Sequence, residues 1–176
     1  NLIKENLVDI KEDGSFRINQ DFFEYSTGFK MTNEKFDKLF GNPARKPESK
    51  INQFYMNIAS SIQKVTEEIL CKILSSLKKE YKISKLCFAG GVALNCVANG
   101  ILKKKVFKNI WIQPAAGDAG GALGAVLAFW HLHLKKERKI NRIDDMQGSF
   151  LGPMYKEKEI RESLDKLGAN YKLLEK

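Results

Sequence analysis

Residues 86–130 read LCFAGGVALNCVANGILKKKVFKNIWIQPAAGDAGGALGAVLAFW, and this stretch decides the fold of the chain. Two short hydrophobic runs, 85–89 at its start and 109–113 within it, predict β-strands. Small residues follow each run, and helical patterns then cover 92–104 and 119–136. A strand–helix–strand–helix series predicts neighbouring parallel strands. The sequence therefore predicts an α/β fold with a parallel βαβα unit.

Glycines occupy both joints between strand and helix. Gly90 and Gly91 end the first strand, and Gly117 and Asp118 follow the second. Glycine lets a ligand approach the backbone closely, and the N-terminus of the next helix favours an anion. In open α/β sheets, ligands bind beyond the carboxyl ends of the strands, where both joints lie. We expect the joints to line a nucleotide cleft; the alternative for Gly90 and Gly91 is a tight turn that needs positive φ.

Two polar residues near the joints have alternative roles. Asn95 would contact ribose or phosphate, or would cap its own helix. Asp118 would cap the second helix, or would hold a divalent cation, because such cations prefer hard oxygen ligands. The glycine spacing fits neither the G-x-G-x-x-G fingerprint nor the phosphate loop that ends in Gly-Lys-Ser/Thr.

The N-terminal half predicts a hairpin and two helices. Residues 7–26 contain two β-like runs around the turn signal Asp13-Gly14. Thr32 is expected to cap a short helix that runs through Phe40. Apolar residues then recur every three or four positions over 49–80, which predicts a long amphipathic helix.

The C-terminal part predicts less regular structure. Residues 137–148 are polar and charged and indicate a linker, and an amphipathic helix is expected at about 157–167. Residues 171–174 read YKLL and would begin a strand.

Composition narrows the classes of protein and partner. The 176 residues are 43% hydrophobic and contain no apolar run long enough to span a membrane. The 3 cysteines lack CxxC spacing and fit reduced thiols in the cytoplasm. His131 and His133 point in different directions on a helix and cannot share a metal.

The charge of the chain favours anionic partners. The net charge is +9, and residues 81–176 hold 17 basic but only 9 acidic side chains. Such an excess attracts phosphates. Nucleic acid is not expected as a partner, because aromatic side chains do not alternate with the basic ones as in single-strand binders.

The same residues resemble a known family. LCFAGGVALNCVANG followed by PAAGDAGGALGA looks like the O-carbamoyltransferases of the nodulation-protein and antibiotic-decorating type. FGNPARKPE (40–48) and ASSIQKVTEE (59–68) resemble segments that precede the double glycine in that family, and the likeness spans about 30–153. The double glycine alone occurs throughout the wider actin-like ATPase superfamily.

The resemblance implies a fold and a reaction. It implies a partial actin-like ATPase (ribonuclease-H-like) fold, with residues 1–147 as the second half of the nucleotide-binding domain. Residues 148–176 would be a linker and the start of a C-terminal carbamoyltransferase domain. Carbamoyl phosphate and ATP would give carbamoyl-adenylate, and the carbamoyl group would pass to a hydroxyl of a small molecule or sugar.

The resemblance also assigns site residues. Nucleotide contacts fall on Gly90, Gly91, Val92, Asn95 and Gly117. A divalent metal (Fe or Mg) falls on Asp118 by similarity to the tRNA threonylcarbamoyl transferases, and Arg45 becomes an anion contact. No residue of this chain is assigned a catalytic role.

The likeness leaves other expectations open. The paired metal-binding histidines of the family and its first phosphate-binding hairpin would precede Asn1, so we expect the isolated chain to be inactive. A homodimer is compatible with the resemblance. The alternatives are another actin-like ATPase, such as a tRNA threonylcarbamoyl transferase or a small-molecule kinase, and a non-catalytic nucleotide-binding module.

Overall fold

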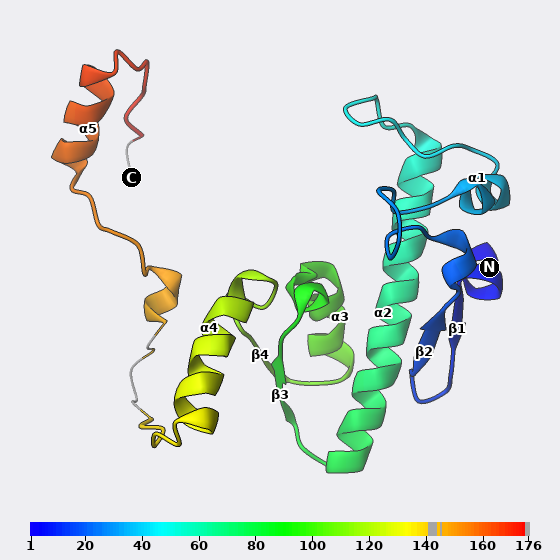
Figure 1. Cartoon of the computed structure of the whole chain (residues 1–176). Coiled ribbons are helices and arrows are strands. Elements are labelled where there is room, and N and C mark those ends of the chain that lie inside the picture. The colour runs from blue at the N-terminus through cyan, green and yellow to red at the C-terminus, as the bar shows by residue number, and fades with distance from the viewer. Residues whose placement is uncertain (141–143, 145, 175–176) are drawn as a thin grey trace. The chain divides into compact units, whose positions relative to one another are not determined.

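A computed structural model describes residues 1–140, 144 and 146–174 (Figure 1). The chain divides into two compact units, Asn1–Ala128 and Phe129–Lys176. The first unit begins with a π-helical turn, Ile3–Leu7, and continues with β1 (Val8–Ile10), β2 (Phe16–Ile18), α1 (Glu34–Phe40), α2 (Gln53–Tyr81), β3 (Lys85–Phe88), α3 (Cys96–Lys105), β4 (Asn109–Ile112) and α4 (Ala119–Ala128). The structure is therefore a mixed α/β fold, as predicted.

The N-terminal hairpin is confirmed. β1 pairs antiparallel with β2, with Val8 opposite Ile18. Gly14 has φ +90° in the turn, and a Cβ there would lie 2.3 Å from the backbone nitrogen of Ile73 on α2. The turn therefore needs glycine both for its conformation and for its close approach to the helix.

The helices α1 and α2 begin later than the sequence predicted. Asn33 rather than Thr32 caps α1, and its side chain accepts hydrogen bonds from the backbone of Lys35 and Phe36. Asn52 caps α2 by accepting from the N–H of Tyr55, so the long helix starts at Gln53 instead of residue 49. In both cases an asparagine supplies the acceptor that the first turn of a helix needs.

The helix α2 packs against two hydrophobic clusters, and it lies between the hairpin and the β3–α3–β4 segment (Figure 1). The first, here the hairpin cluster, has Ile3, Leu7 and Val8 at its centre. The second, here the sheet cluster, is built from Leu74, Leu86, Leu102, Val106 and Phe107.

The predicted parallel unit is present. β3 pairs parallel with β4, with Leu86 opposite Ile110, and α3 connects them. The helix predicted over 92–104 is interrupted, because a short 3₁₀ turn, Gly91–Leu94, precedes the extended residue Asn95 and the start of α3. The helix predicted over 119–136 is present as α4 up to Ala128 and continues as a π-helical turn, Phe129–His133.

The second unit contains a π-helical turn, Phe129–His133, and the helix α5, Glu157–Lys166, which confirms the predicted C-terminal helix. The strand predicted over 171–174 is wrong, because these residues form no regular element. The predicted linker includes positions 141–143 and 145, which lie outside the described residues. The domain boundary at 147/148 stays a prediction, while the compact units divide after Ala128.

None of the helices in the described ranges combines the length and apolar character needed to cross a membrane.

Candidate nucleotide-binding site

The two glycine-rich joints lie side by side. The backbone N–H of Gly90 donates to the carbonyl of Ala116 at 2.9 Å, which ties the first joint to the second. A Cβ on Gly117 would lie 4.0 Å from the Cα of Gly91 and from Cδ1 of Leu94. The expected proximity of the joints is confirmed, because parallel strands end at the same edge of a sheet.

Gly90 adopts a backbone conformation that other residues avoid. Its φ is +106° and its ψ is 160°, a region occupied almost only by glycine. A Cβ at Gly90 or Gly91 would meet nothing within 4 Å. Glycine at position 90 is therefore required by conformation rather than packing, and the space beside both glycines is open. The positive-φ turn is present, and ligand contact at these glycines stays a prediction.

The start of the 3₁₀ turn offers backbone donors at this open edge. The first N–H groups of a helical turn have no partner within the turn, and here they belong to Gly91 and Val92. The side chain of Val92 is 53% exposed. These groups have the polarity that a phosphate oxygen requires.

Asn95 acts as the N-cap of α3. Its Oδ1 accepts from the N–H of Ala98 at 3.0 Å. The same amide forms a reciprocal pair with Gln63 of α2: Asn95 Nδ2 donates to Gln63 Oε1 at 2.8 Å, and Gln63 Nε2 donates to Asn95 Oδ1 at 3.1 Å. The capping role is present, and the nucleotide contact stays a prediction.

Sequence reasoning overlooked Gln63. The signal that could have revealed it is its spacing along α2, because Gln63 and Glu67 continue the row of Leu70, Cys71 and Leu74 that faces the sheet cluster. A polar residue at the end of an apolar row needs a polar partner.

A second asparagine near the first joint leaves an acceptor unused. Asn99 Nδ2 donates to the carbonyl of Ala93 at 2.7 Å. Its Oδ1 is buried and finds no hydrogen-bond partner within the described part of the chain. Buried polar atoms are normally satisfied, so this oxygen would accept a hydrogen bond from a bound molecule or a water.

The second joint borders a pocket of about 360 Å³ between the end of β4 and α4. Its lining is mostly small and apolar and includes Ala89, Gly117 and Gly121. Gly120 is needed for packing, because a Cβ there would lie 2.0 Å from the carbonyl oxygen of Ala115. A Cβ at Gly121 or Gly124 would meet nothing within 4 Å, so these glycines leave the helix surface open.

Asp118 precedes α4 and is exposed, and its backbone carbonyl accepts from the N–H of Gly121 at 3.0 Å. Its carboxylate has the chemistry of an iron or magnesium ligand. Across residues 1–140, 144 and 146–174, however, no three His, Cys, Asp or Glu side chains gather closely enough to hold a metal ion. The described residues alone do not fit a metal centre, and Asp118 as a ligand stays a prediction.

The side chain of Arg45 forms hydrogen bonds within its own loop. Its Nη1 donates to the carbonyls of Lys46 and Ser49, and its side chain is exposed. The anion contact predicted for Arg45 has no support from these hydrogen bonds and stays a prediction.

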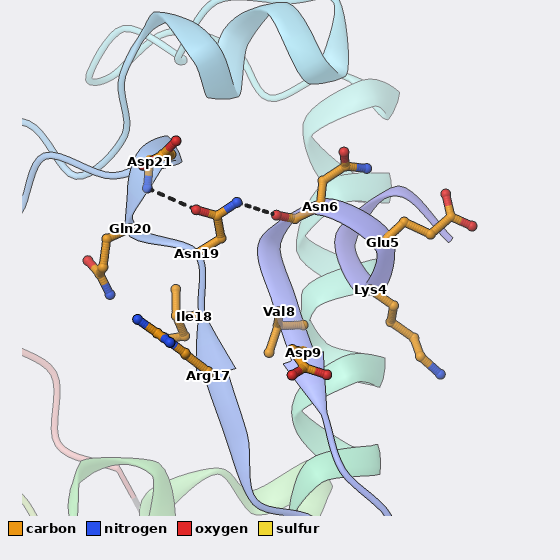
Figure 2. Close-up of a pocket in the computed structure, with 10 residues that line it drawn as sticks. All are labelled: Lys4, Glu5, Asn6, Val8, Asp9, Arg17, Ile18, Asn19, Gln20 and Asp21. Atoms are coloured by element: carbon orange, nitrogen blue, oxygen red, sulfur yellow. Dashed lines mark hydrogen bonds between the residues drawn. The ribbon is translucent and has the colours of Figure 1, made fainter.

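A larger pocket, about 570 Å³, lies between the first helical turn and the hairpin (Figure 2). Asn19 bridges its rim by donating to the carbonyl of Asn6 and accepting from the N–H of Asp21, at 3.0 and 3.2 Å. The lining mixes the bases Lys4 and Arg17 with acidic side chains, so it has no excess of positive charge for an anion. None of the predicted nucleotide contacts lies there.

Known proteins are similar to this chain over the region that contains the two glycine-rich joints. The family model described as Carbamoyltransferase N-terminus matches residues 1–127. The uncharacterized protein sll1178 of Synechocystis sp. is 54% identical over 164 residues, which are 93% of this chain and 27% of that protein. Nodulation protein NolO of Bradyrhizobium diazoefficiens is 43% identical over 76 residues, 43% of this chain and 14% of NolO.

A more distant relative is the uncharacterized protein MJ1058 of Methanocaldococcus jannaschii, 30% identical over 111 residues, 62% of this chain and 18% of that protein. The chain spans between 14% and 27% of the length of these three relatives. The family match covers both glycine-rich joints and the whole of β3, α3 and β4. The chain therefore belongs to the carbamoyltransferase family and matches its N-terminal region.

Proposed function

We propose that this chain forms part of the nucleotide site of an ATP-dependent O-carbamoyltransferase. The observation that carries the proposal is the hydrogen bond between Gly90 and Ala116, which holds the two glycine-rich joints together at the carboxyl ends of parallel strands. Family membership supports carbamoyl transfer over the kinase, threonylcarbamoyl transferase and non-catalytic alternatives. We further propose that the parallel unit belongs to an actin-like ATPase fold.

The proposed reaction activates carbamate as a mixed anhydride. Water converts carbamoyl phosphate to carbamate and inorganic phosphate, and a carbamate oxygen then displaces pyrophosphate from the α-phosphorus of ATP. The acceptor hydroxyl oxygen bonds to the carbamoyl carbon of the adenylate, its proton leaves to a base, and AMP departs. Activation is needed because carbamate itself is a poor electrophile.

The residues of this chain would bind and orient the nucleotide. The N–H groups of Gly91 and Val92 would donate to phosphate oxygens at the start of the helical turn. The open space at Gly90 and Gly91 would admit the phosphates to the backbone. Asn95 and Gly117 complete the proposed contacts. Metal binding at Asp118, an anion contact at Arg45, a hydroxyl-bearing acceptor, a homodimer and a cytoplasmic location belong to the same proposal.

The test is ATP affinity in the full-length gene product, measured by isothermal titration. In Gly91→Val the new Cβ has no atom within 4 Å in this structure, and the side chain would fill the space that the phosphates need. We expect at least about tenfold weaker binding, the size of one lost charge-assisted hydrogen bond. Gly100→Val, a glycine of α3 that is equally free of neighbours, is the control and should bind normally. Equal ATP affinity in both variants and the wild type would refute the proposal.

A further inference from the structure

We infer that Gln63 is a positioning residue of the proposed nucleotide site, which sets the Asn95 amide so that one N–H is directed to an acceptor atom of the nucleotide. The inference rests on the proposed function. Gln63 belongs to α2 and Asn95 caps α3, 32 residues later. Their two hydrogen bonds, 2.8 and 3.1 Å, close a ring between the side-chain amides.

The hydrogen bonds run from the Ala98 N–H through the amides of Asn95 and Gln63 to the Glu67 carboxylate. Ala98 and Glu67, at the two ends, determine which atom of each amide donates and which accepts. At one end the backbone N–H of Ala98 can only donate, so the atom of Asn95 that it meets must be the oxygen. At the other end Gln63 Nε2 lies 2.8 Å from Oε1 of Glu67, and a carboxylate accepts. Gln63 Nε2 therefore donates to both Glu67 and Asn95 Oδ1, and Gln63 Oε1 accepts from Asn95 Nδ2.

A count of hydrogen-bonding capacity shows what remains for a ligand. A side-chain amide has two donors and two acceptor lone pairs. Asn95 Oδ1 accepts from Ala98 and from Gln63, and one N–H of Nδ2 goes to Gln63. The second N–H of Nδ2 has no partner among the residues that the structure describes. The ligand atom that meets Asn95 must therefore be an acceptor, such as a phosphate oxygen, a ribose oxygen or a ring nitrogen.

The helix that carries Gln63 is held in place by packing. The row of Leu70, Cys71 and Leu74 further along α2 packs into the sheet cluster together with Leu102 of α3. Since both helices contribute to one buried cluster, the distance from Gln63 to the N-terminus of α3 is fixed. Without Gln63, the cap bond to Ala98 would remain, but the Asn95 amide would be free to tilt about it.

The experiment measures ATP affinity in the full-length gene product. Gln63→Met keeps the length and helix propensity of the side chain but removes its hydrogen bonds. We expect about tenfold weaker ATP binding, the scale of a lost hydrogen bond to a charged group. Gln53→Met is the matched control, because Gln53 also lies on α2 and, among the described residues, its side chain bonds only to nearby Asn57, at 2.8 Å. Its ATP affinity should be unchanged.

A second variant separates positioning from helix capping. Asn95→Asp retains oxygens that accept from the N–H groups of Ala98 and Gln63, but it has no N–H for the ligand or for Gln63 Oε1. It also places a negative charge beside the ligand, and we expect at least a tenfold loss of ATP affinity. The double variant should bind no worse than Asn95→Asp, because Gln63 acts only through Asn95. If Gln63 had only a structural role, Gln63→Met would lower the melting temperature. The affinity losses of Gln63→Met and Asn95→Asp would then add up in the double variant.

The outcomes distinguish the two proposals. Wild-type ATP affinity in Gln63→Met, or additive losses in the double variant, would overturn the role of Gln63 while Gly91→Val still tests the nucleotide site. Absence of ATP binding by the wild-type protein would overturn both. If Gln63→Met does not fold, Gln63→Ala carries the same expectation, because alanine is favourable within a helix.

Discussion

At the scale of single residues, the structure distinguishes glycines that look alike in the sequence. Gly90 and Gly91 are adjacent and both have room for a Cβ, yet only Gly90 has positive φ. Gly120 and Gly121 are also adjacent, and only Gly120 lies against the backbone of Ala115. Each pair thus contains one glycine required by the fold and one that the fold does not require.

Gly90→Ala should therefore destabilise the chain, whereas Gly91→Ala should not. The strain of a non-glycine residue at φ +106° costs about 1–3 kcal/mol. Gly91→Ala is expected to change stability by less than about 0.5 kcal/mol, as exposed substitutions usually do. Urea unfolding of the two variants measures the difference. Equal midpoints would show that the loop relaxes to a conformation that alanine tolerates.

Acid should weaken the contact between the first helical turn and α2. Lys4 Nζ donates to the carboxylate of Glu68 at 2.9 Å, and this hydrogen bond lowers the pKa of Glu68 below its ordinary value of 4.5. A lowered pKa in the folded state gives stability that is present above pH 4.5 and is lost as the pH falls through the lowered value.

Lys4→Met should therefore flatten the dependence of stability on pH below 4.5, with less than about 1 kcal/mol lost at neutral pH because the pair is partly exposed. The measurement is the urea midpoint between neutral pH and pH 3. Lys38→Met is the control, because within the described part of the chain Lys38 forms only an exposed ion pair, with Glu34 at 4.0 Å. An unchanged acid dependence in Lys4→Met would contradict the assignment.

At the scale of elements, local patterns predicted most of the fold. The turn at Asp13-Gly14, the long helix and both parallel strands follow from periodicity and glycine placement. The break before α3 was predicted only as an alternative, in which Asn95 caps its own helix, because asparagine occurs both within helices and as a cap. The change from α4 to a π-helical turn at Phe129 could not be predicted, because the apolar pattern continues through Trp130.

The candidate site was predictable only in part. The parallel order of the two strands is enough to place Gly90 and Gly117 at one edge of the sheet, because both residues follow the carboxyl end of a strand. The partner of Asn95 was not predictable, because periodicity locates Gln63 on a face of α2 without saying which residue of α3 it meets.

Substitutions in α4 should show how closely it packs on the preceding loop. In Gly120→Ala the new Cβ would lie 2.0 Å from a backbone oxygen, and the resulting shift should cost about 1–3 kcal/mol. Gly121→Ala has no such conflict and should gain up to about 1 kcal/mol from helix propensity. Thermal unfolding followed by circular dichroism compares the two. A stabilising Gly120→Ala would show that α4 lies further from Ala115.

At the scale of the whole molecule, the first unit has little sheet and much exposed apolar surface. Each described sheet has two strands, fewer than the three or more that independent stability normally requires. Large side chains such as Trp111 and Val126 are 55% and 67% exposed. Apolar surface of this kind favours association with further protein.

The 176-residue chain by itself should therefore be marginally stable. We expect it to bind the dye ANS, to unfold in urea over a broad range, and to have a free energy of unfolding below about 5 kcal/mol. A sharp unfolding transition without dye binding would contradict this prediction.

Because α2 packs into both hydrophobic clusters, it couples the local unfolding of one cluster to that of the other. Val65 and Ile69 pack against the hairpin cluster, while Leu70, the residue after Ile69, and Leu74 contribute to the sheet cluster. Neither cluster can open without releasing the same few turns of helix. The backbone amides of residues 65–74 should therefore exchange with deuterium more slowly than any others in the first unit, and the two clusters should protect one another as a single cooperative block.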